Sequence, residues 1–546
     1  MPLKIIDNFT GRLTRNNIGD MNSGMAKYST TYGNNPFATP ERLTWFEQPL
    51  LVDTMFTTIT GVIVAAKARL ESGITYVYAV DHKRRVYKIQ VNSPSTHNAN
   101  YDNPVLLTTL SVNCNGLGLP SFKYGGSMQF FGNTAQIYIG HDHGVTRLNF
   151  DGTGEAYIIG SNNTDNVPSP LAVFGQYLYV GSGPELVQIN GTPTVINGGI
   201  LNPAFPTGSY VRSIDVVPAG NYLEIIVSKI LPADITVSTQ DTASLAATDS
   251  TKYLWNGVDP TYNSFENYYG FGLTANETFG AYSYWFGNDL NGTAVYTDKS
   301  KILSLPSSLS PLPTGVFSTG NMVGFAAPDY TTANGKLTGA VSMFGQYDSE
   351  IPKGVFRLFR INASSQDNLT DTDIIQMPVC LTVSNLFYGN SNSGYANNLI
   401  GTAKIYFSTV EVNASTTHYK FYKFDMVPTG LGNAIGGVYE TQQETSLKLF
   451  RSIVARKFKP TAVRFYTSSL VSGNSFKIDL IGSNLAPMNG GSQTFTVGTN
   501  VTAGADYVWF TPATEPTYSL GVRITNLGNV NWTGNKLEVD YEEGGY

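Results

Sequence analysis

The fold of this chain is indicated by one short stretch, Phe174-Gly-Gln-Tyr-Leu-Tyr-Val-Gly-Ser-Gly-Pro-Glu-Leu-Val-Gln-Ile-Asn190. Two apolar runs, residues 177–180 and 186–189, are separated by a Gly/Ser/Pro segment at 181–184. Short apolar runs bounded by glycine and proline are typical of strands joined by a tight turn. We therefore predict an antiparallel hairpin here.

Similar runs occur elsewhere: Phe131-Gly-Asn133 before Ile137-Tyr-Ile-Gly140, Phe286-Gly-Asn288 before Ala294-Val-Tyr296, and Phe344-Gly-Gln-Tyr347. A hairpin that repeats cannot bury its apolar face alone, so its copies have to stack on one another. The later strands of these units recur at residues 86–91, 145–150, 186–190, 302–305, 355–361 and 418–424, with a less clear member at 252–255. This pattern predicts an all-β fold containing a β-propeller of about seven blades, and six or eight blades fit equally well.

Changes in composition divide the chain into three parts. Residues 1–58 are irregular, and we interpret them as an N-terminal arm that either wraps a neighbouring subunit or supplies an outer strand to close a ring. Residues 59–428 hold the repeated strand pairs and form the predicted propeller. After a glycine-rich junction, residues 429–546 show longer strands with clean alternation, which is typical of a β-sandwich or jelly roll.

Composition excludes several classes of function. Charged residues are only 14% of the chain and the formal net charge is −6, whereas a general nucleic-acid binder carries a basic domain or stripe. Two cysteines, Cys114 and Cys380, are too few for a disulfide framework, so we expect both to be reduced. No apolar run is long enough for a signal peptide or a membrane span. We expect a chain made in the cytoplasm.

The sequence carries no catalytic motif. The most metal-like group is His141-Asp-His143, but its position in a hairpin turn favours ordinary turn chemistry over a zinc site. The acidic run at 367–373 lacks the glycine and distal glutamate of a calcium loop. We therefore expect no catalytic residue, no metal and no cofactor, and no enzymatic activity.

Two groups of side chains are candidates for binding a partner. An aromatic run is suited to core packing, to a protein interface or to stacking against a sugar, and it contains Tyr268, Tyr269, Tyr282, Tyr284 and Trp285. A basic group opens the C-terminal domain, and it contains Lys448, Arg451, Arg456, Lys457 and Lys459. The basic group is either a solvated face or a contact with an acidic partner surface or passing nucleic acid.

The chain resembles the propeller-plus-sandwich virion proteins of tailed bacteriophages, which include tail nozzle and tail-stabilising components. The resemblance rests on three features: Asn35-Pro-Phe37 with Pro40 ahead of the first blade, the Phe-Gly-x-Tyr-x-Tyr-x-Gly texture of the blades, and Phe458-Lys-Pro-Thr-Ala-Val-Arg-Phe-Tyr466 followed by Ser472-Gly-Asn-Ser-Phe-Lys-Ile-Asp479. It implies a structural protein of the virion tail that forms a homo-oligomeric ring and contacts other tail proteins, without sequence-specific binding of nucleic acid.

Two alternatives remain open. The first is a propeller that binds a carbohydrate or a host-surface receptor through its aromatic residues. The second, which the sequence favours less, is a propeller glycoside hydrolase. Acidic side chains that converge in the central channel would favour the hydrolase.

Overall fold

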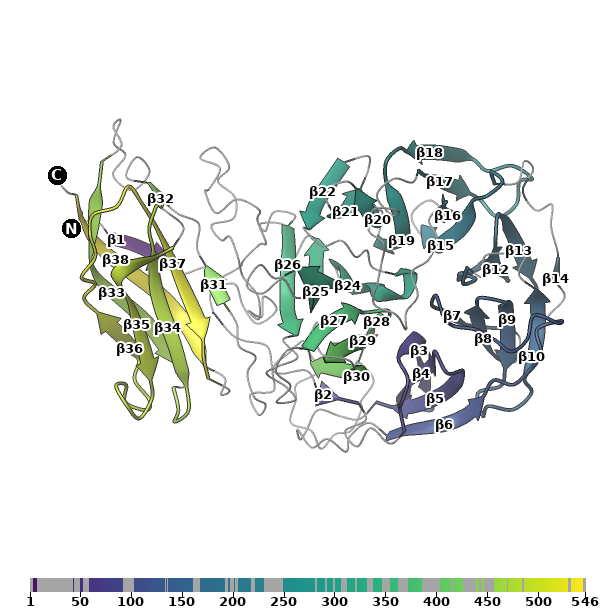
Figure 1. Ribbon diagram of the computed structural model, residues 1–546, viewed down its shortest axis with the longest axis horizontal. Coiled ribbons are helices and arrows are strands. Elements are labelled where there is room, and N and C mark those ends of the chain that lie inside the picture. The colour runs from purple at the N-terminus through teal and green to yellow at the C-terminus, as the bar shows by residue number, and fades with distance from the viewer. Residues whose placement is uncertain are drawn as a thin grey trace.

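The computed structural model describes residues 3–6, 43, 50–52, 58–91, 103–132, 134, 136–160, 167–191, 195–196, 201, 205–217, 221–229, 249–279, 282–289, 292–297, 300–305, 312–319, 322–330, 337–345, 354–361, 372–384, 403–413, 416–425, 438–440, 444–445, 456–468, 470–483, 486–528 and 532–543. These residues form antiparallel strands and one short 3-10 helix, η1 (Pro313–Gly315). Seven of the sheets stand around a ring, and two more pack as a sandwich at one end of the molecule (Figure 1). The predicted all-β propeller with a C-terminal sandwich is confirmed.

The first six blades are four-stranded sheets whose strands follow one another in the sequence. Blades 1 to 3 are β3 (Ile63–Glu71), β4 (Ile74–Asp81), β5 (Arg85–Gln90) and β6 (Asn103–Thr109); β7 (Ser127–Phe131), β8 (Gln136–His141), β9 (Gly144–Leu148) and β10 (Ala156–Gly160); and β11 (Leu171–Phe174), β12 (Tyr177–Ser182), β13 (Glu185–Ile189) and β14 (Val195–Ile196). Blades 4 to 6 are β15 (Tyr210–Val217), β16 (Tyr222–Ser228), β17 (Ser250–Trp255) and β18 (Ser264–Tyr268); β19 (Gly272–Phe279), β20 (Tyr282–Asp289), β21 (Gly292–Thr297) and β22 (Ser300–Leu305); and β23 (Val316–Thr319), β24 (Met322–Tyr330), β25 (Leu337–Gly345) and β26 (Gly354–Ile361).

Blade 7 takes its outermost strand from the other end of the chain. Its inner strands β27 (Thr372–Gln376) and β28 (Cys380–Ser384) both pair with β29 (Ala403–Asn413), which pairs with β30 (Thr416–Asp425). The strand β2 (Leu50–Leu51) then pairs with β30, and the Val52 amide donates to the Phe421 carbonyl at 2.9 Å. This is the ring-closing outer strand that the sequence analysis gave as one of two alternatives for the opening residues.

The C-terminal domain consists of two sheets that enclose a core of its own. One sheet contains β1 (Leu3–Ile6), β33 (Phe458–Ser468), β36 (Tyr507–Phe510) and β38 (Thr533–Glu543), and the other contains β31 (Val438–Glu440), β32 (Glu444–Thr445), β34 (Ser475–Ile481), β35 (Pro487–Thr496) and β37 (Ser519–Asn526). β1 pairs with β38, and Leu43 exchanges backbone hydrogen bonds with Gly534. The described parts of residues 1–58 are therefore built into both domains. These described segments complete sheets of the same chain, as in the ring-closing alternative, and the rest of residues 1–58 lies outside the described residues.

The propeller core lies between the blades. Each hydrophobic cluster joins two successive sheets: residues of blades 1 and 2 pack together, then those of blades 2 and 3, and so on to blades 5 and 6. A further cluster joins blade 7 to blade 1 and includes Val52 of the closing segment. Cys114 and Cys380 are both buried and form no disulfide. Within the described ranges, no helix is long and apolar enough to cross a membrane.

The repeated glycines have a steric reason. Gly140 on β8 approaches the next blade so closely that a Cβ there would lie 2.1 Å from the Ser169 carbonyl oxygen. Gly181, at the corresponding place on β12, would meet Val211 at 2.7 Å. Any larger residue at either position would push the neighbouring inner strand away, so the Tyr-x-Gly texture reflects the close packing of one blade on the next.

The Phe-Gly repeat, however, does not occupy one position in every blade. At Phe174 and at Phe131 the innermost strand ends and the chain turns into the second strand. Phe286 instead lies inside the second strand of blade 5, and Phe344 lies near the end of the third strand of blade 6. Equating all four positions was therefore wrong. The reason is that glycine serves both at turns and at close contacts between strands.

Closure of the ring predicts the effect of one apolar substitution. Val52→Ala removes methyl groups from the cluster between blades 7 and 1, where Val52 is 1% exposed, and should lower the free energy of unfolding by about 2 kcal/mol. The matched change Val258→Ala, at a side chain that is 85% exposed, should alter it by less than about 0.5 kcal/mol. Chemical denaturation of both variants measures the difference, and equal effects would contradict the closing role of this segment.

Candidate functional site

The innermost strands of the blades line the centre of the propeller. β3, β7, β11, β15, β19, β23 and β28 contact one another in this order, and β28 returns to β3. Hydrogen bonds also cross between neighbouring blades here: Thr278 Oγ1 donates to the Val216 carbonyl at 2.6 Å, and Ser408 Oγ donates to the Ile63 carbonyl at 2.8 Å. Polar side chains on these inner strands therefore lie around the central channel of the propeller.

Arg212 is placed by an irregularity in β15. The register between β15 and β16 shifts between Val211 and Ser213, so Arg212 has no partner residue across the ladder. Such a β-bulge redirects the side chain that it carries. Arg212 is only 5% exposed, and its Nε and Nη1 have no hydrogen-bond partner. Burial lowers the pKa of Arg212 to about 10.

The same irregularity recurs on other inner strands. β3, β19 and β27 shift register at Val64, Thr274 and Ile375. These residues are apolar or carry only a hydroxyl, so the bulge itself is a feature of the blade and does not require a charge. Arg212 is the charged residue at such a position among the described strands. The bulge is therefore a structural feature shared by several blades, and in blade 4 it also places the candidate binding residue Arg212.

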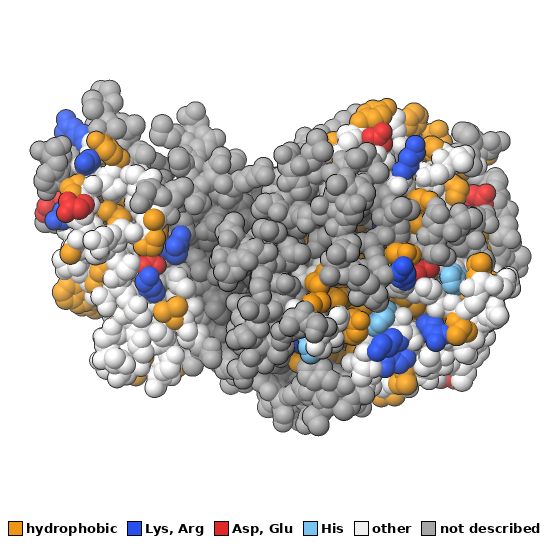
Figure 2. All heavy atoms as spheres, viewed as in Figure 1, with side chains coloured by type: hydrophobic (Ala, Val, Ile, Leu, Met, Phe, Trp, Pro, Cys, Tyr) orange, Lys and Arg blue, Asp and Glu red, His pale blue; other side chains and the backbone are white. Residues whose placement is uncertain are grey.

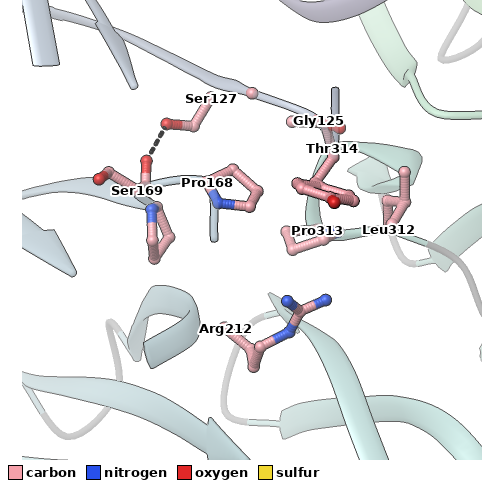
Figure 3. Close-up of a pocket in the computed structure, with 11 residues that line it drawn as sticks. Gly125, Ser127, Pro168, Ser169, Arg212, Leu312, Pro313 and Thr314 are labelled. Atoms are coloured by element: carbon pink, nitrogen blue, oxygen red, sulfur yellow. Dashed lines mark hydrogen bonds between the residues drawn. The ribbon is translucent and has the colours of Figure 1, made fainter. Parts of the chain in front are cut away.

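Arg212 lines a small pocket at the start of the inner strands. Its lining contains no Asp or Glu and consists of Tyr124, Gly125, Gly126, Ser127, Pro168, Ser169, Pro170, Arg212, Leu312, Pro313 and Thr314. Figure 3 shows the Arg212 guanidinium directed into the space between Pro168 and Pro313. The cavity has a volume of about 20 Å³, which is room for roughly one water-sized group.

Further along the channel lies a cluster of charged and polar groups. Lys67 Nζ donates to Gln129 Oε1. Lys67 also interacts electrostatically with Asp215 and Glu277, which lie on the neighbouring strands β15 and β19. The Val216 amide donates to Asp215 Oδ1 at 2.8 Å, and Ser318 forms a side-chain hydrogen bond with Glu277.

The negative charge of Asp215 acts on the neighbouring Glu277 carboxyl group. Burial, followed by the negative charge of Asp215, raises the pKa of Glu277 to about 8. Burial also raises the pKa of Asp215. Burial lowers the pKa of Lys67, and the two acids oppose that change. At neutral pH the site therefore favours a protonated Glu277 beside Asp215, an arrangement that is found where carboxyl groups act in proton transfer.

A second hollow lies on the face shown in Figure 2, near the turn between β4 and β5. It has a volume of about 250 Å³ and is lined by His82, Arg84, Pro120, Ser121, Phe122 and Lys123. Figure 2 shows Lys and Arg side chains gathered over this part of the propeller. Burial lowers the pKa of His82, so the positive charge of the hollow comes from Arg84 and Lys123.

The side chains of His141 and Asp142 form hydrogen bonds with groups in and around their own hairpin turn. His141 Nδ1 accepts from the His143 amide at 3.2 Å, and its Nε2 lies 3.0 Å from Thr146 Oγ1. Asp142 Oδ2 accepts from Ser121 Oγ at 3.0 Å. Across the residues that the structure describes, no three His, Cys, Asp or Glu side chains form a group suited to a metal ion.

The structure separates the predicted aromatic group. Tyr268, Tyr284 and Trp285 are buried, and Lys252 Nζ lies 3.7 Å from the centre of the Trp285 ring. These three side chains pack between blades, which is the core-packing alternative of the sequence analysis. Tyr269 is 71% exposed. The Tyr282 side chain lies outside the described residues.

The basic group is described only in part. Lys448 and Arg451 lie outside the described residues. Arg456 is exposed, whereas Lys457 and Lys459 are half-buried. Lys457 Nζ lies 5.4 Å from the Tyr518 ring centre. Whether the five residues act as one contact stays a prediction.

Sequence reasoning missed Arg212, Asp215 and Glu277. The available signal was charge within short apolar runs: Arg212 and Asp215 both interrupt the strand Tyr-Val-Arg-Ser-Ile-Asp-Val-Val. Such a charge on an inner strand of a propeller is more costly to bury than one at a turn. This pattern would have identified Arg212 and Asp215 as candidate site residues. It would not have predicted which residues of other blades lie close to them.

Comparison with known proteins finds structural similarity at low sequence identity. The chain matches no known protein family and no curated protein. Similar solved structures include a chain of a mitotic checkpoint complex, 9% identical over 74% of this chain and 99% of that chain with a TM-score of 0.40. The β-propeller domain of Myceliophteria thermophila Swd1 is 7% identical over 69% of this chain and 99% of that chain, with a TM-score of 0.38. A glycoside hydrolase family 43 enzyme from Bacillus subtilis is 8% identical over 91% and 99%, with a TM-score of only 0.24.

The channel carboxyls predict an unusual dependence of stability on pH. The unfolded chain releases the Glu277 proton near pH 4.5, whereas the folded chain holds it until about pH 8. Raising the pH across this window therefore favours unfolding, with a slope of up to about 1.4 kcal/mol per pH unit from this group. Glu277→Gln should flatten the slope, and the exposed Glu515→Gln should leave it unchanged. Denaturation curves across the window test this, and equal slopes for Glu277→Gln and the unaltered protein would contradict it.

Proposed function

We propose that this protein is a structural component of a bacteriophage tail and that its copies assemble into a closed ring. The observation that carries the proposal is the presence of exposed aromatic side chains on edge strands of both domains. The confirmed combination of propeller and sandwich supports the same proposal, because it is the architecture on which the resemblance to tail proteins rests. The low share of charged residues, 14%, suits a surface that neighbouring subunits cover.

The first surface, here called the sandwich patch, consists of Tyr507 and Trp509 on β36. This strand pairs on one side with β33 and forms the edge of its sheet. Trp509 is 61% and Tyr507 50% exposed, whereas Val508 between them is buried in the domain core. Tyr466 extends the patch, because its ring centre lies 5.9 Å from that of Tyr507. Aromatic side chains of this kind are enriched at protein interfaces.

The second surface, here called the blade 4 patch, consists of Phe265 and Tyr269. β18 is the outermost strand of blade 4. Phe265 lies within this strand, and Tyr269 directly follows its last residue. Phe265 is 55% and Tyr269 71% exposed. Figure 1 places β18 on the part of the propeller away from the sandwich.

The separation of the two patches favours a ring. A contact between unlike surfaces is heterologous, and it produces a closed ring when the rotation between subunits closes. A twofold dimer would instead bury one patch against the same patch of a second copy. We infer that the sandwich patch of one subunit contacts the blade 4 patch of the next.

A glycoside hydrolase is a second candidate function, favoured by the acidic pair in the channel. Retaining and inverting glycosidases both need one protonated and one ionised carboxyl group, and Glu277 with Asp215 offers two carboxyls with raised pKa values. Hydrolysis of aryl glycosides that is lost in both Asp215→Asn and Glu277→Gln would favour this candidate over a purely structural role. If the unaltered protein hydrolyses none of the aryl glycosides tested, the glycoside hydrolase is ruled out as a candidate function.

The ring proposal predicts the result of mixing two variants. Tyr507→Ala/Trp509→Ala removes one side of the contact, and Phe265→Ala/Tyr269→Ala removes the other. Each variant alone should be monomeric, because every contact then lacks a partner surface. A mixture of the two should stop at a dimer, since one intact contact remains. Light scattering measures the masses, and electron microscopy of the unaltered protein should show closed rings.

A matched control is Val471→Ala, which truncates an exposed side chain of the sandwich outside the patch. This variant should assemble like the unaltered protein. Rings formed by either double variant alone would contradict the proposed contact, and an unaltered protein that stays monomeric at all concentrations would contradict the ring itself.

A further inference from the structure

We propose that the Arg212 pocket binds a small monovalent anion, either a halide or a short carboxylate such as formate. The pocket is separate from the proposed subunit contacts, which involve other side chains of blade 4 and the sandwich. The inference rests on three features of the pocket: a buried cation without a counter-charge, a second unused donor, and a very small volume.

The first feature is the isolation of the Arg212 charge. Arg212 is 5% exposed, and two of its guanidinium nitrogens have no hydrogen-bond partner. A buried charge without a partner costs several kcal/mol, and buried donors are almost always paired. The described residues lining the pocket include no carboxylate. An anion would supply both the missing acceptor and the missing negative charge, whereas a water molecule would supply the acceptor alone.

The Asp215 carboxylate on the same strand does not fill this role. Its Oδ1 accepts from the Val216 amide and the carboxylate interacts electrostatically with Lys67, whereas its Oδ2 has no hydrogen-bond partner. Salt bridges within the described parts of the chain include none to Arg212. The channel cluster of Lys67, Asp215 and Glu277 contains both acidic and basic groups. The Arg212 pocket is separate from it and contains a basic group without an acidic one.

The second feature is Ser169, a buried residue whose hydroxyl also has no hydrogen-bond partner. Its backbone is fixed, because Ser127 Oγ donates to the Ser169 carbonyl at 2.6 Å and the Ser169 amide donates to the His141 carbonyl at 3.4 Å (Figure 3). The close approach of Gly140 leaves this backbone no room to move toward blade 2. Arg212 and Ser169 both line the pocket. Figure 3 shows the guanidinium directed into it and the Ser169 hydroxyl turned away from Arg212, so rotation about the Ser169 Cα–Cβ bond would bring this donor to a bound anion.

The third feature is size. A cavity volume of about 20 Å³ holds roughly one water-sized group. A halide, or the carboxylate end of formate, matches this space and a single positive charge. Sulfate and phosphate carry four oxygens and a larger charge, so they exceed both the volume and the neutralising capacity of the pocket. The prolines at 168, 170 and 313 carry no amide hydrogen, so they add no further donors.

Anion-dependent thermal stability tests the proposal. In a buffer free of small anions, sodium bromide and sodium formate are each titrated against sodium sulfate at equal ionic strength. The unaltered protein should show a saturable rise in Tm with bromide or formate and none with sulfate. Comparing bromide with formate shows whether a halide or a carboxylate is preferred. A rise that is the same for all three salts would overturn the proposal.

Variants assign the effect to the pocket. Arg212→Met should weaken anion binding at least tenfold, and it should raise Tm in the anion-free buffer because it removes an uncompensated buried charge. Arg69→Met is the matched control, because the Arg69 guanidinium lies 3.7 Å from the Phe150 ring centre and lines no part of the pocket. It should keep the full anion response. An Arg212→Met protein with an unchanged response would overturn the assignment.

A second variant keeps the test decisive if Arg212→Met fails to fold. Ser169→Ala removes one donor and keeps the charge, so it should weaken binding several-fold without abolishing it. Diffraction from crystals soaked in bromide locates the ion directly by its anomalous signal. A peak within hydrogen-bonding distance of Arg212 and Ser169 would support the proposal, and bromide bound only at other places would overturn it.

Discussion

The whole propeller depends on the closure of its ring. Hydrophobic clusters join each of blades 1 to 5 to the next blade, and one more joins blade 7 to blade 1 where the ring closes. The pairing of β2 with β30 and the hydrogen bond from Ser408 Oγ to the Ile63 carbonyl hold this junction. With the ring closed, the inner strands face one another at fixed distances. The polar groups of the channel owe their positions to this closure rather than to any local motif.

Much of the architecture was predictable because it follows from local patterns. Aromatic and β-branched alternation, with glycine at turns, indicated strands wherever it occurred, and the recurrence of the pattern indicated a propeller. The register of the repeat was less predictable. Gly175 has a positive φ of 60° at a turn, whereas Gly287 has a carbonyl of the adjacent strand where its Cβ would lie. A single sequence does not distinguish these two uses of glycine.

The candidate site was beyond sequence reasoning for a different reason. Lys67, Asp215 and Glu277 come from three blades and meet only when the ring has formed. The burial of an aromatic residue was equally hard to predict, since Tyr268, the last residue of β18, is buried and Tyr269, which follows it in the turn, is exposed. The strand was identifiable, but the side that faces the next blade depends on how the blades are packed.

The path of the first residues has a consequence for how the chain folds. Leu3 pairs with Asp540, and Leu50 pairs with Lys423, so both domains are completed by contacts between residues that lie far apart in the sequence. Contacts between such distant residues make folding slow, because the entropy of closing a very long loop is lost before the contact forms. During synthesis β2 stays without its partner until β30 has left the ribosome, and β1 stays without its partner until β38 has done so. Both strands are therefore made long before they are paired.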